Sequence, residues 1–252
     1  MSSALEGQPE LALGDALGSN VVSVGLVLGL AVLVGPVRVT GGVVSRDIAA
    51  AIAVPLVTIL LASDGELGRA DAVVLLHVFG VWLLAVVIEA RRGRSAAPEV
   101  LGEHSLGRSI PVVAGALVLL IAAGRLIVTG ATGLGTDLGI DPFVVGVVLV
   151  AIGTSAPELA ITVIARARGH EEIGLGTVLV SNVYNGAVVI PVTAAISTIT
   201  VDWSEIAVSL VYGLAVVAAL LPVFGAVLGR RRGVLLVLLY VSSVFTLLAT
   251  QD

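Results

Sequence analysis

The chain has 252 residues, of which 58% are hydrophobic and only 12% charged, and its formal net charge is −5. Together with a mean hydropathy of +1.13, this excludes a soluble domain, because so few charges could not cover a water-exposed surface. The acidic balance gives no sign of nucleic-acid binding, and the absence of cysteine excludes disulfides and thiolate metal sites.

Long apolar runs follow one another down the whole chain. A bilayer core of about 30 Å requires roughly 20 apolar residues in a helix, and the runs lack the strict alternation of barrel strands. The sequence therefore predicts an all-α integral membrane protein with about eight transmembrane helices. In chain order these are 11–35, 48–63, 71–90, 109–130, 142–165, 173–197, 205–227 and 233–250.

Arginine sorts to one set of loops. The loops after the first, third, fifth and seventh spans carry most of the arginines, including the Arg230–Arg232 cluster, whereas the opposite loops are mainly acidic. Cytoplasmic loops are enriched in basic residues. We therefore expect a multi-pass protein of the cell inner (plasma) membrane, with the arginine-bearing loops in the cytoplasm and both termini outside.

An internal repeat links the first and sixth spans. Residues 7–23 align without gaps with residues 169–185, an offset of 162, and eight of the 17 positions are identical. Shared apolar composition would not match the polar residues, yet Glu10, Ser19 and Asn20 all find identical partners. Such duplications are typical of secondary transporters.

The spans around the two copies are unequal in number. Two spans precede the second copy within its half and two follow it, whereas the first copy is followed by two spans and preceded by none. An odd count of five spans per unit inserts the second unit upside down. We therefore expect an inverted-repeat transporter fold with 3 + 5 of an expected 5 + 5 helices. Residues 1–95 would form a partial first repeat, 96–108 a cytoplasmic linker, and 109–252 the second repeat.

The fifth span carries the strongest chemical signal, Gly153-Thr154-Ser155-Ala156-Pro157-Glu158. A carboxylate within a membrane costs at least about 2.5–3.5 kcal/mol, so Glu158 should face a polar interior. Pro157 leaves carbonyls of the preceding turn free, and Thr154 and Ser155 share a helix face with Glu158. A hard cation such as Ca²⁺ binds six to eight such oxygens. The alternative is a proline-kinked helix whose glutamate is protonated or bonded to a neighbouring helix.

That hexapeptide, followed by Gly176 and by Ser181-Asn182-Val183-Tyr184-Asn185, resembles the α-repeat of the cation/Ca²⁺ exchanger superfamily, in particular the ten-helix prokaryotic Na⁺/Ca²⁺ exchangers. The resemblance implies that Glu158 is the central ligand shared by Ca²⁺ and Na⁺. It implies further ligands in each of the three helices concerned: Thr154, Ser155 and the Ala151 carbonyl; Ser181 and Asn185; Ser19 and Ser23. Two departures, Ser23 for the usual Asn and Val180 for the usual Gly, bear on the stoichiometry and the driving ion.

The family has two such glutamate helices, and the offset of 162 places the partner of Glu158 five residues before Met1. We therefore expect that the first two helices of the fold are missing, through a late-assigned start or a true truncation.

The expected function is secondary active cation antiport, with Ca²⁺ export coupled to Na⁺ influx, without enzymatic activity or a cofactor. The partners would be Ca²⁺, Na⁺ or H⁺, and the lipid bilayer. The alternatives are a Ca²⁺/H⁺ exchanger, or a non-transporting fragment or subunit that needs a separate N-terminal part. An intramembrane serine protease built on Ser155 and His77 lacks the Gly-x-Ser-x-Gly elbow, since residue 157 is proline. Asp15 is either a helix-start charge, which we favour, or an ion-entry residue.

Overall fold

The structure is a computed structural model that describes residues 7–39, 42–93, 106–221 and 227–250. Most of the predicted 96–108 linker lies outside these residues, and the helix after it begins at Leu106. The predicted division into two repeats at this point therefore stays a prediction.

Within the described ranges, seven helical stretches are long and apolar enough to cross a membrane, and an eighth, Ile206–Ala218, is apolar but shorter. The prediction of about eight membrane helices is thus confirmed. The helices are α2 (Pro9–Val21), η1 (Val22–Leu28), α3 (Gly29–Val34), α4 (Gly42–Leu61), η2 (Ala62–Asp64), α5 (Arg69–Gly93), α6 (Leu106–Leu138), α7 (Pro142–Val145), η3 (Gly146–Val150), α8 (Ala151–Thr154), α9 (Ala156–Ala167), α10 (Glu171–Tyr184), η4 (Asn185–Val189), α11 (Ile190–Ile196), α12 (Trp203–Ala218) and α13 (Arg230–Ala249).

Several helix boundaries differ from the sequence expectation; α4, for example, begins at Gly42 and not at residue 48. Helix α6 extends to Leu138, beyond the predicted end at residue 130, because hydropathy marks the apolar part of a helix and not its continuation toward the polar rim. Helix α12 ends at Ala218, before the predicted end of the 205–227 span, and residues 222–226 of that span lie outside the described part of the chain.

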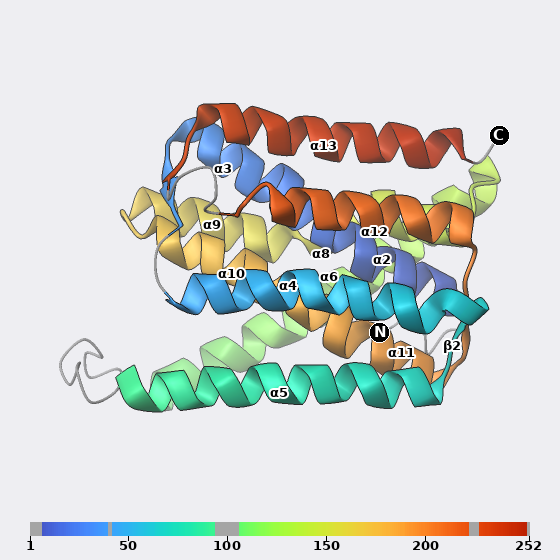
Figure 1. The fold of residues 1–252 in the computed structure, drawn as a ribbon, viewed down its shortest axis with the longest axis horizontal. Helices are drawn as coiled ribbons and strands as arrows, with labels where there is room; N and C mark the ends of the chain where they lie inside the picture. Colours follow the sequence, from blue (N-terminus) through green and yellow to red (C-terminus); the bar gives the residue numbers. More distant parts are fainter. Residues whose placement is uncertain (1–6, 40–41, 94–105, 222–226, 251–252) are drawn as a thin grey trace.

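The two copies of the repeat run in opposite directions through the molecule. In Figure 1 the path from α2 to α3 runs from right to left, whereas the path from α10 to α11 runs from left to right. An inverted repeat therefore organises the fold, as the odd number of intervening spans predicts.

Two short β-pairs join the halves at opposite ends of the helices. Strand β1 (Val37–Arg38) pairs antiparallel with β4 (Val227–Leu228), and β2 (Glu66–Leu67) pairs antiparallel with β3 (Ile199–Thr200). Each pair joins two loops that the arginine distribution assigns to the same side of the membrane. The structure thus groups the loops as their charges do.

Helix α2 lies at the centre of the bundle and makes its closest crossing with the segment from α7 to α8. A Cβ atom on Gly18 would lie 2.5 Å from the Cα atom of Val147, and one on Gly14 would meet the carbonyl oxygen of Phe143. Only glycine permits backbones to approach this closely, which is how membrane helices gain packing contact. The crossing brings α2 against the part of the fifth span that directly precedes Glu158.

Each repeat helix contains a π-helical segment that begins at the same relative position to within one residue. Segment η1 begins at Val22 and η4 at Asn185, and residue 22 aligns with residue 184 under the offset of 162. The two segments hold Ser23 and its counterpart Asn185. A π-turn widens the helix locally and often marks a functional site.

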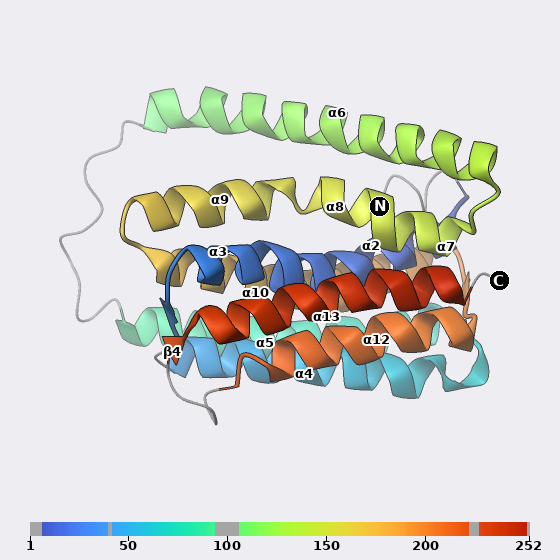
Figure 2. The same cartoon turned by 90° about the horizontal axis from the view of Figure 1, so that it is seen from above.

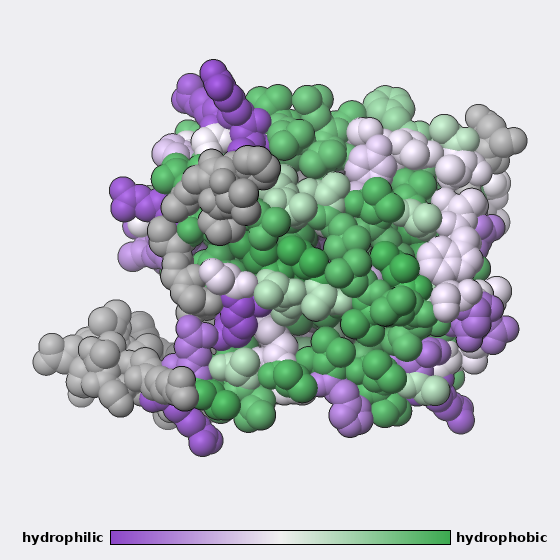
Figure 3. All heavy atoms as spheres, viewed as in Figure 1, coloured by the Kyte–Doolittle hydropathy of each residue, from purple (hydrophilic) through white to green (hydrophobic). Residues whose placement is uncertain are grey.

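The outer surface matches a lipid environment. Figure 3 shows a broad apolar band across the middle of the visible face, with polar residues gathered toward both ends of the helices. Large exposed apolar side chains occur on the peripheral helices, for example Val81 on α5 and Leu126 on α6, and α6 lies along one edge of the bundle (Figure 2). A soluble protein would not present so large an apolar surface, so the fold is that of a multi-pass membrane protein.

Candidate ion-binding site

The candidate site lies where three interrupted helices meet in the middle of the bundle. These are α2–η1, α8–α9 and α10–η4, and the structure brings all of the sequence-predicted residues into this region. Side-chain hydrogen bonds connect the three helices: Ser19 with Thr154, Ser23 with Ser155, and Ser181 with Glu158. Ala151 is fully buried beside them.

The backbone of the fifth span breaks at Ser155. Helix α8 ends at Thr154 and α9 begins at Ala156, while Ser155 has φ −84° and ψ 2°. Pro157 has no amide hydrogen to donate to the Gly153 carbonyl, so the helical ladder is interrupted there. The Ala151 carbonyl accepts from the Ser155 amide at 3.1 Å. The break leaves hydroxyl and carbonyl oxygens of one turn close to the carboxylate of the next.

Glu158 lies in the first turn of α9 and is half-buried. Its Oε1 accepts a hydrogen bond of 2.7 Å from the hydroxyl of Ser181. Its Oε2 is buried and has no hydrogen-bond partner among the described residues. The amino end of α9 favours a negative charge at this position. The carboxylate therefore has one oxygen anchored by α10 and one free to coordinate a cation.

The hydroxyl of Thr154 is the most crowded oxygen of the site. It lies 3.0 Å from the Ser19 hydroxyl, 2.7 Å from the Asp15 carboxylate and 3.3 Å from the Ala151 carbonyl. Ser155, 2% exposed, accepts from the hydroxyl of Ser23 at 3.3 Å. Hydroxyl and carbonyl oxygens from α2–η1 and α8 thus face one another across the helix crossing.

Asp15 corrects the sequence interpretation, which favoured a helix-start charge. Helix α2 begins at Pro9, and its first-turn acid is Glu10, so Asp15 lies in the second turn. There it accepts hydrogen bonds from Thr154 at 2.7 Å and from Ser19 at 3.2 Å. The expected helix start at residue 11 was too late, and no local pattern indicated a contact 139 residues away.

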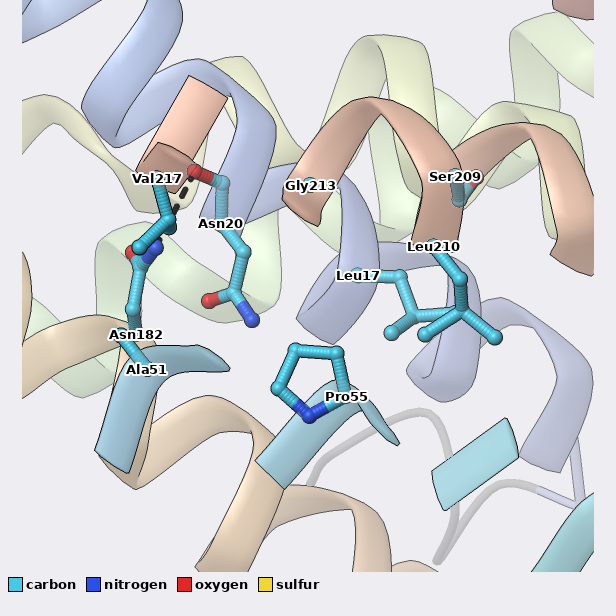
Figure 4. A pocket seen from close by; sticks show the side chains of 9 residues that line it. All are labelled: Leu17, Asn20, Ala51, Pro55, Asn182, Ser209, Leu210, Gly213 and Val217. Carbon is cyan, nitrogen blue, oxygen red and sulfur yellow. Dashed lines mark hydrogen bonds between the residues drawn. The ribbon is translucent and has the colours of Figure 1, made fainter. Parts of the chain in front are cut away.

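Two asparagines, Asn20 and Asn182, also belong to the site although they were not among the predicted ligands. The amide of Asn182 donates to the backbone carbonyl of Asn20 at 3.4 Å, and the amide of Asn185 donates to Asn20 Oδ1 at 3.1 Å. Figure 4 shows Asn20 and Asn182 lining a small cavity closed by Pro55 of α4 and Ser209 of α12. The identity of these asparagines in both repeat copies was the signal that could have found them.

The polar atoms that surround Glu158 in the candidate site are mainly oxygens. In the described part of the chain, no three or more His, Asp or Glu side chains converge on a common point, so the oxygens come mainly from hydroxyls, carbonyls and amides around Glu158. Such a set suits a hard cation that keeps part of its water. The serine-protease alternative would require His77 to bond to Ser155. Instead, Ser155 bonds to Ser23, and His77 bonds to the carbonyl of Val73 in its own helix.

A broken helix that presents a carboxylate and carbonyl oxygens at the interface of two inverted repeats is an arrangement typical of secondary transporter folds. Residues 1–88 and 108–249 match the sequence profile of the sodium/calcium exchanger protein family. The chain belongs to this family, and the resemblance noted in the sequence is thereby confirmed.

Relatives and solved structures agree with this assignment. The chain is 33% identical to the inner membrane protein YrbG of Escherichia coli over 211 residues, and 31% identical to the putative antiporter CaxA of Alkalimonas amylolytica over 212 residues. Each match covers 80% of this chain and 65% of the relative. The sodium-calcium exchanger NCX_Mj superposes with a TM-score of 0.73 at 25% identity, over 97% of this chain and 79% of that chain.

Proposed function

We propose that the protein is a secondary active antiporter that exports Ca²⁺ in exchange for Na⁺, with Glu158 as the ligand that both ions share. The observation that carries the proposal is the Glu158 carboxylate itself. One of its oxygens is held by Ser181 and the other is buried without a protein partner. A buried carboxylate oxygen of this kind is costly unless a cation neutralises it.

The remaining ligands follow from the neighbourhood of that oxygen. Thr154, Ser155 and the Ala151 carbonyl lie on the turn before Glu158, and Ser19 and Ser23 reach the same turn from α2–η1. Ser181 and Asn185 contribute from α10–η4. This set offers a carboxylate, hydroxyls, an amide and a carbonyl, to which water would add the rest of a Ca²⁺ shell.

Coupling follows from competition for one carboxylate. If Ca²⁺ and Na⁺ both require Glu158, only one kind of ion occupies it at a time, and alternating access converts a Na⁺ gradient into Ca²⁺ movement. The names of two similar proteins support the proposed exchange of Ca²⁺ for Na⁺: CaxA is described as a putative antiporter and NCX_Mj as a sodium-calcium exchanger. The protein would act as a transporter and not as an enzyme.

In the cell inner membrane, the loops rich in arginine would face the cytoplasm, and this orientation would set the outward direction of transport. YrbG, described as an inner membrane protein, supports the location.

The test is ion flux in liposomes containing the purified chain. An outward-directed Ca²⁺ flux should follow an imposed Na⁺ gradient, and Glu158→Gln should abolish it, because the amide keeps the size of the side chain but loses the charge. Glu66→Gln, at an exposed position in β2, is the matched control and should transport normally. Undiminished exchange by Glu158→Gln would refute the assignment.

Two further arms separate the alternatives. Ca²⁺ flux driven by a pH gradient without Na⁺ would identify a Ca²⁺/H⁺ exchanger. The chain spans only 65% of the length of the relatives YrbG and CaxA, so the same assay is also run on a form extended with the translated upstream DNA. Flux from the extended form alone would support the alternative that the 252-residue chain is a non-transporting fragment.

A further inference from the structure

Helices α3 and α9 lie next to each other (Figures 1 and 2), and an apolar groove of about 530 Å³ runs between them. Its walls include Leu30 and Val34 of α3, and on α9 they extend from Leu159 to Ala167. At 1.5 Å per residue, that stretch of α9 is about 12 Å long. Val34 and Val163 are 73% and 57% exposed, so the groove is open to the outer apolar surface that faces lipid.

Arg166 of α9 lines the groove at its polar end. Its Nη1 atom is buried and has no hydrogen-bond partner among the described residues, and none of the ion pairs in that part of the chain includes Arg166. The guanidinium is held against the backbone of Gly35, where a Cβ atom would collide with Nη2 and lie 3.2 Å from Cζ. A buried charged donor without an acceptor is costly, so the geometry favours an anion in the groove.

Thr162 lines the same groove one helical turn before Arg166. It is 4% exposed, and its hydroxyl has no hydrogen-bond partner in the described part of the chain. Four residues of helix place Thr162 about 6 Å along the axis from Arg166. Along α9 the groove therefore presents a cation, then a hydroxyl donor, then apolar side chains as far as Leu159. A glycerophospholipid presents complementary groups in the same order: a phosphate, an ester oxygen and a hydrocarbon chain.

We propose that this groove binds one anionic glycerophospholipid, with its phosphate on Arg166, an ester oxygen near Thr162 and an acyl chain along Leu159 and Val163. Basic pockets between membrane helices on the cytoplasmic side bind anionic headgroups, and the arginine distribution predicts that side for this end of α9. A zwitterionic lipid brings its own cation and neutralises the arginine less well. The bound lipid would contact both α3 and the helix that carries Glu158, and its binding does not depend on the proposed ion exchange.

Two pairs of variants test the headgroup and the groove separately. Arg166→Gln removes the charge that faces the groove, and Arg168→Gln removes an exposed charge two residues further on. Val163→Trp fills the groove with an indole ring. Ile164→Trp adds the same ring at the neighbouring position of α9, which is 51% exposed and lies outside the groove.

The experiment titrates the delipidated full chain in detergent with dioleoyl phosphatidylglycerol or dioleoyl phosphatidylcholine and counts bound lipids by native mass spectrometry. We expect one phosphatidylglycerol to bind at least about fivefold more tightly than phosphatidylcholine, from the attraction of one arginine. Arg166→Gln should lower the affinity for phosphatidylglycerol to that for phosphatidylcholine. Val163→Trp should weaken the binding of both lipids, whereas Arg168→Gln and Ile164→Trp should bind as the wild type does.

Several results would overturn the lipid site. These are equal affinity of the wild type for the two lipids, an unchanged preference in Arg166→Gln, and a dimer that Val163→Trp dissociates, which would assign the groove to a second copy of the chain. Should Arg166→Gln fail to fold, equal phosphatidylglycerol binding by Val163→Trp and Ile164→Trp would still refute the proposal. The exchange of Ca²⁺ for Na⁺ is tested by the liposome assay and stands or falls separately.

Discussion

The side-chain amide of Asn182 donates to the backbone carbonyl of Asn20, and these two residues are counterparts in the internal repeat, 162 positions apart. Equivalent residues of a duplicated unit can touch only where the axis that relates the two copies passes between them. The approximate two-fold axis of the fold therefore runs through this contact. The site residues Ser19 and Ser181 precede the two asparagines directly in the chain, which places the candidate ligands around the axis.

Removal of the Asn20 side chain should loosen this junction. Asn20→Ala leaves the partly buried amide of Asn185 without the Oδ1 acceptor that it now bonds at 3.1 Å, and the loss of this bond should cost about 1 kcal/mol. We expect a lower midpoint of thermal unfolding in detergent. Thr177→Ala is the control, because the Thr177 hydroxyl bonds only a carbonyl of its own helix; equal losses for both variants would argue against a junction at Asn20.

The close crossing of α2 gives a matched pair of glycine variants. A Cβ on Gly14 would meet the backbone carbonyl of Phe143, whereas its repeat counterpart Gly176 has nothing within 4 Å. Gly14→Ala should therefore destabilise the protein by about 1–3 kcal/mol, as overpacking does. Gly176→Ala should be neutral or stabilising by up to about 1 kcal/mol, since alanine favours helix. Heat denaturation of the two purified variants compares them directly, and the reverse order would contradict the observed packing.

The break at Ser155 should matter more for binding than for stability. Pro157→Ala restores an amide hydrogen that can bond to the Gly153 carbonyl, so α8 and α9 should approach one continuous helix and turn the hydroxyls of Thr154 and Ser155 away from their present partners. We expect Ca²⁺ affinity to fall about tenfold, or about 1.4 kcal/mol, with an unchanged or higher unfolding temperature. Unaltered Ca²⁺ affinity would show that the break does not shape the site.

Asp47 of α4 forms a hydrogen bond with α5 at a place outside the ion site. It is 1% exposed, lies 2.8 Å from Arg46 and accepts from the indole of Trp82 at 3.0 Å. Asp47→Ala should cost about 3 kcal/mol, because it leaves a partly buried arginine and an indole donor without their acceptor. Glu89→Gln removes the more exposed partner of Arg46 and should cost less than about 1 kcal/mol. Unfolding of the two variants by denaturant in detergent measures both free-energy losses. Both variants should retain Ca²⁺ binding.

Much of the architecture could be predicted from the sequence, because hydropathy, arginine distribution and the duplicated segment each report on the whole length of a span. The inverted arrangement of α2–α3 and α10–α11 follows from a count of spans. The break at Ser155 follows from Pro157, whose missing amide hydrogen acts within a single turn. These are local or additive properties, and the sequence carries them directly.

Pairing between distant residues could not be predicted in the same way. Nothing near Asp15 indicates that its carboxylate meets Thr154, and the hydroxyls of Ser19 and Ser23 could have served either neighbouring helix. The π-helical segments η1 and η4 were also missed, because an α-helix and a π-turn have the same apolar composition and differ only in which carbonyl each amide reaches. Such features depend on the packing of helices against one another.

The paired strands at the two ends of the bundle have a mechanical consequence. Backbone hydrogen bonds of β1 with β4 hold the first repeat to the second at one rim, and those of β2 with β3 do the same at the opposite rim. Both contacts are sealed by buried apolar residues, Val37 against Leu228 and Leu67 against Ile199. A large rigid-body rotation of one repeat relative to the other would break the backbone hydrogen bonds of both strand pairs. Small displacements of single helices, with both strand pairs intact, would therefore cost less free energy as a way to open a path for an ion.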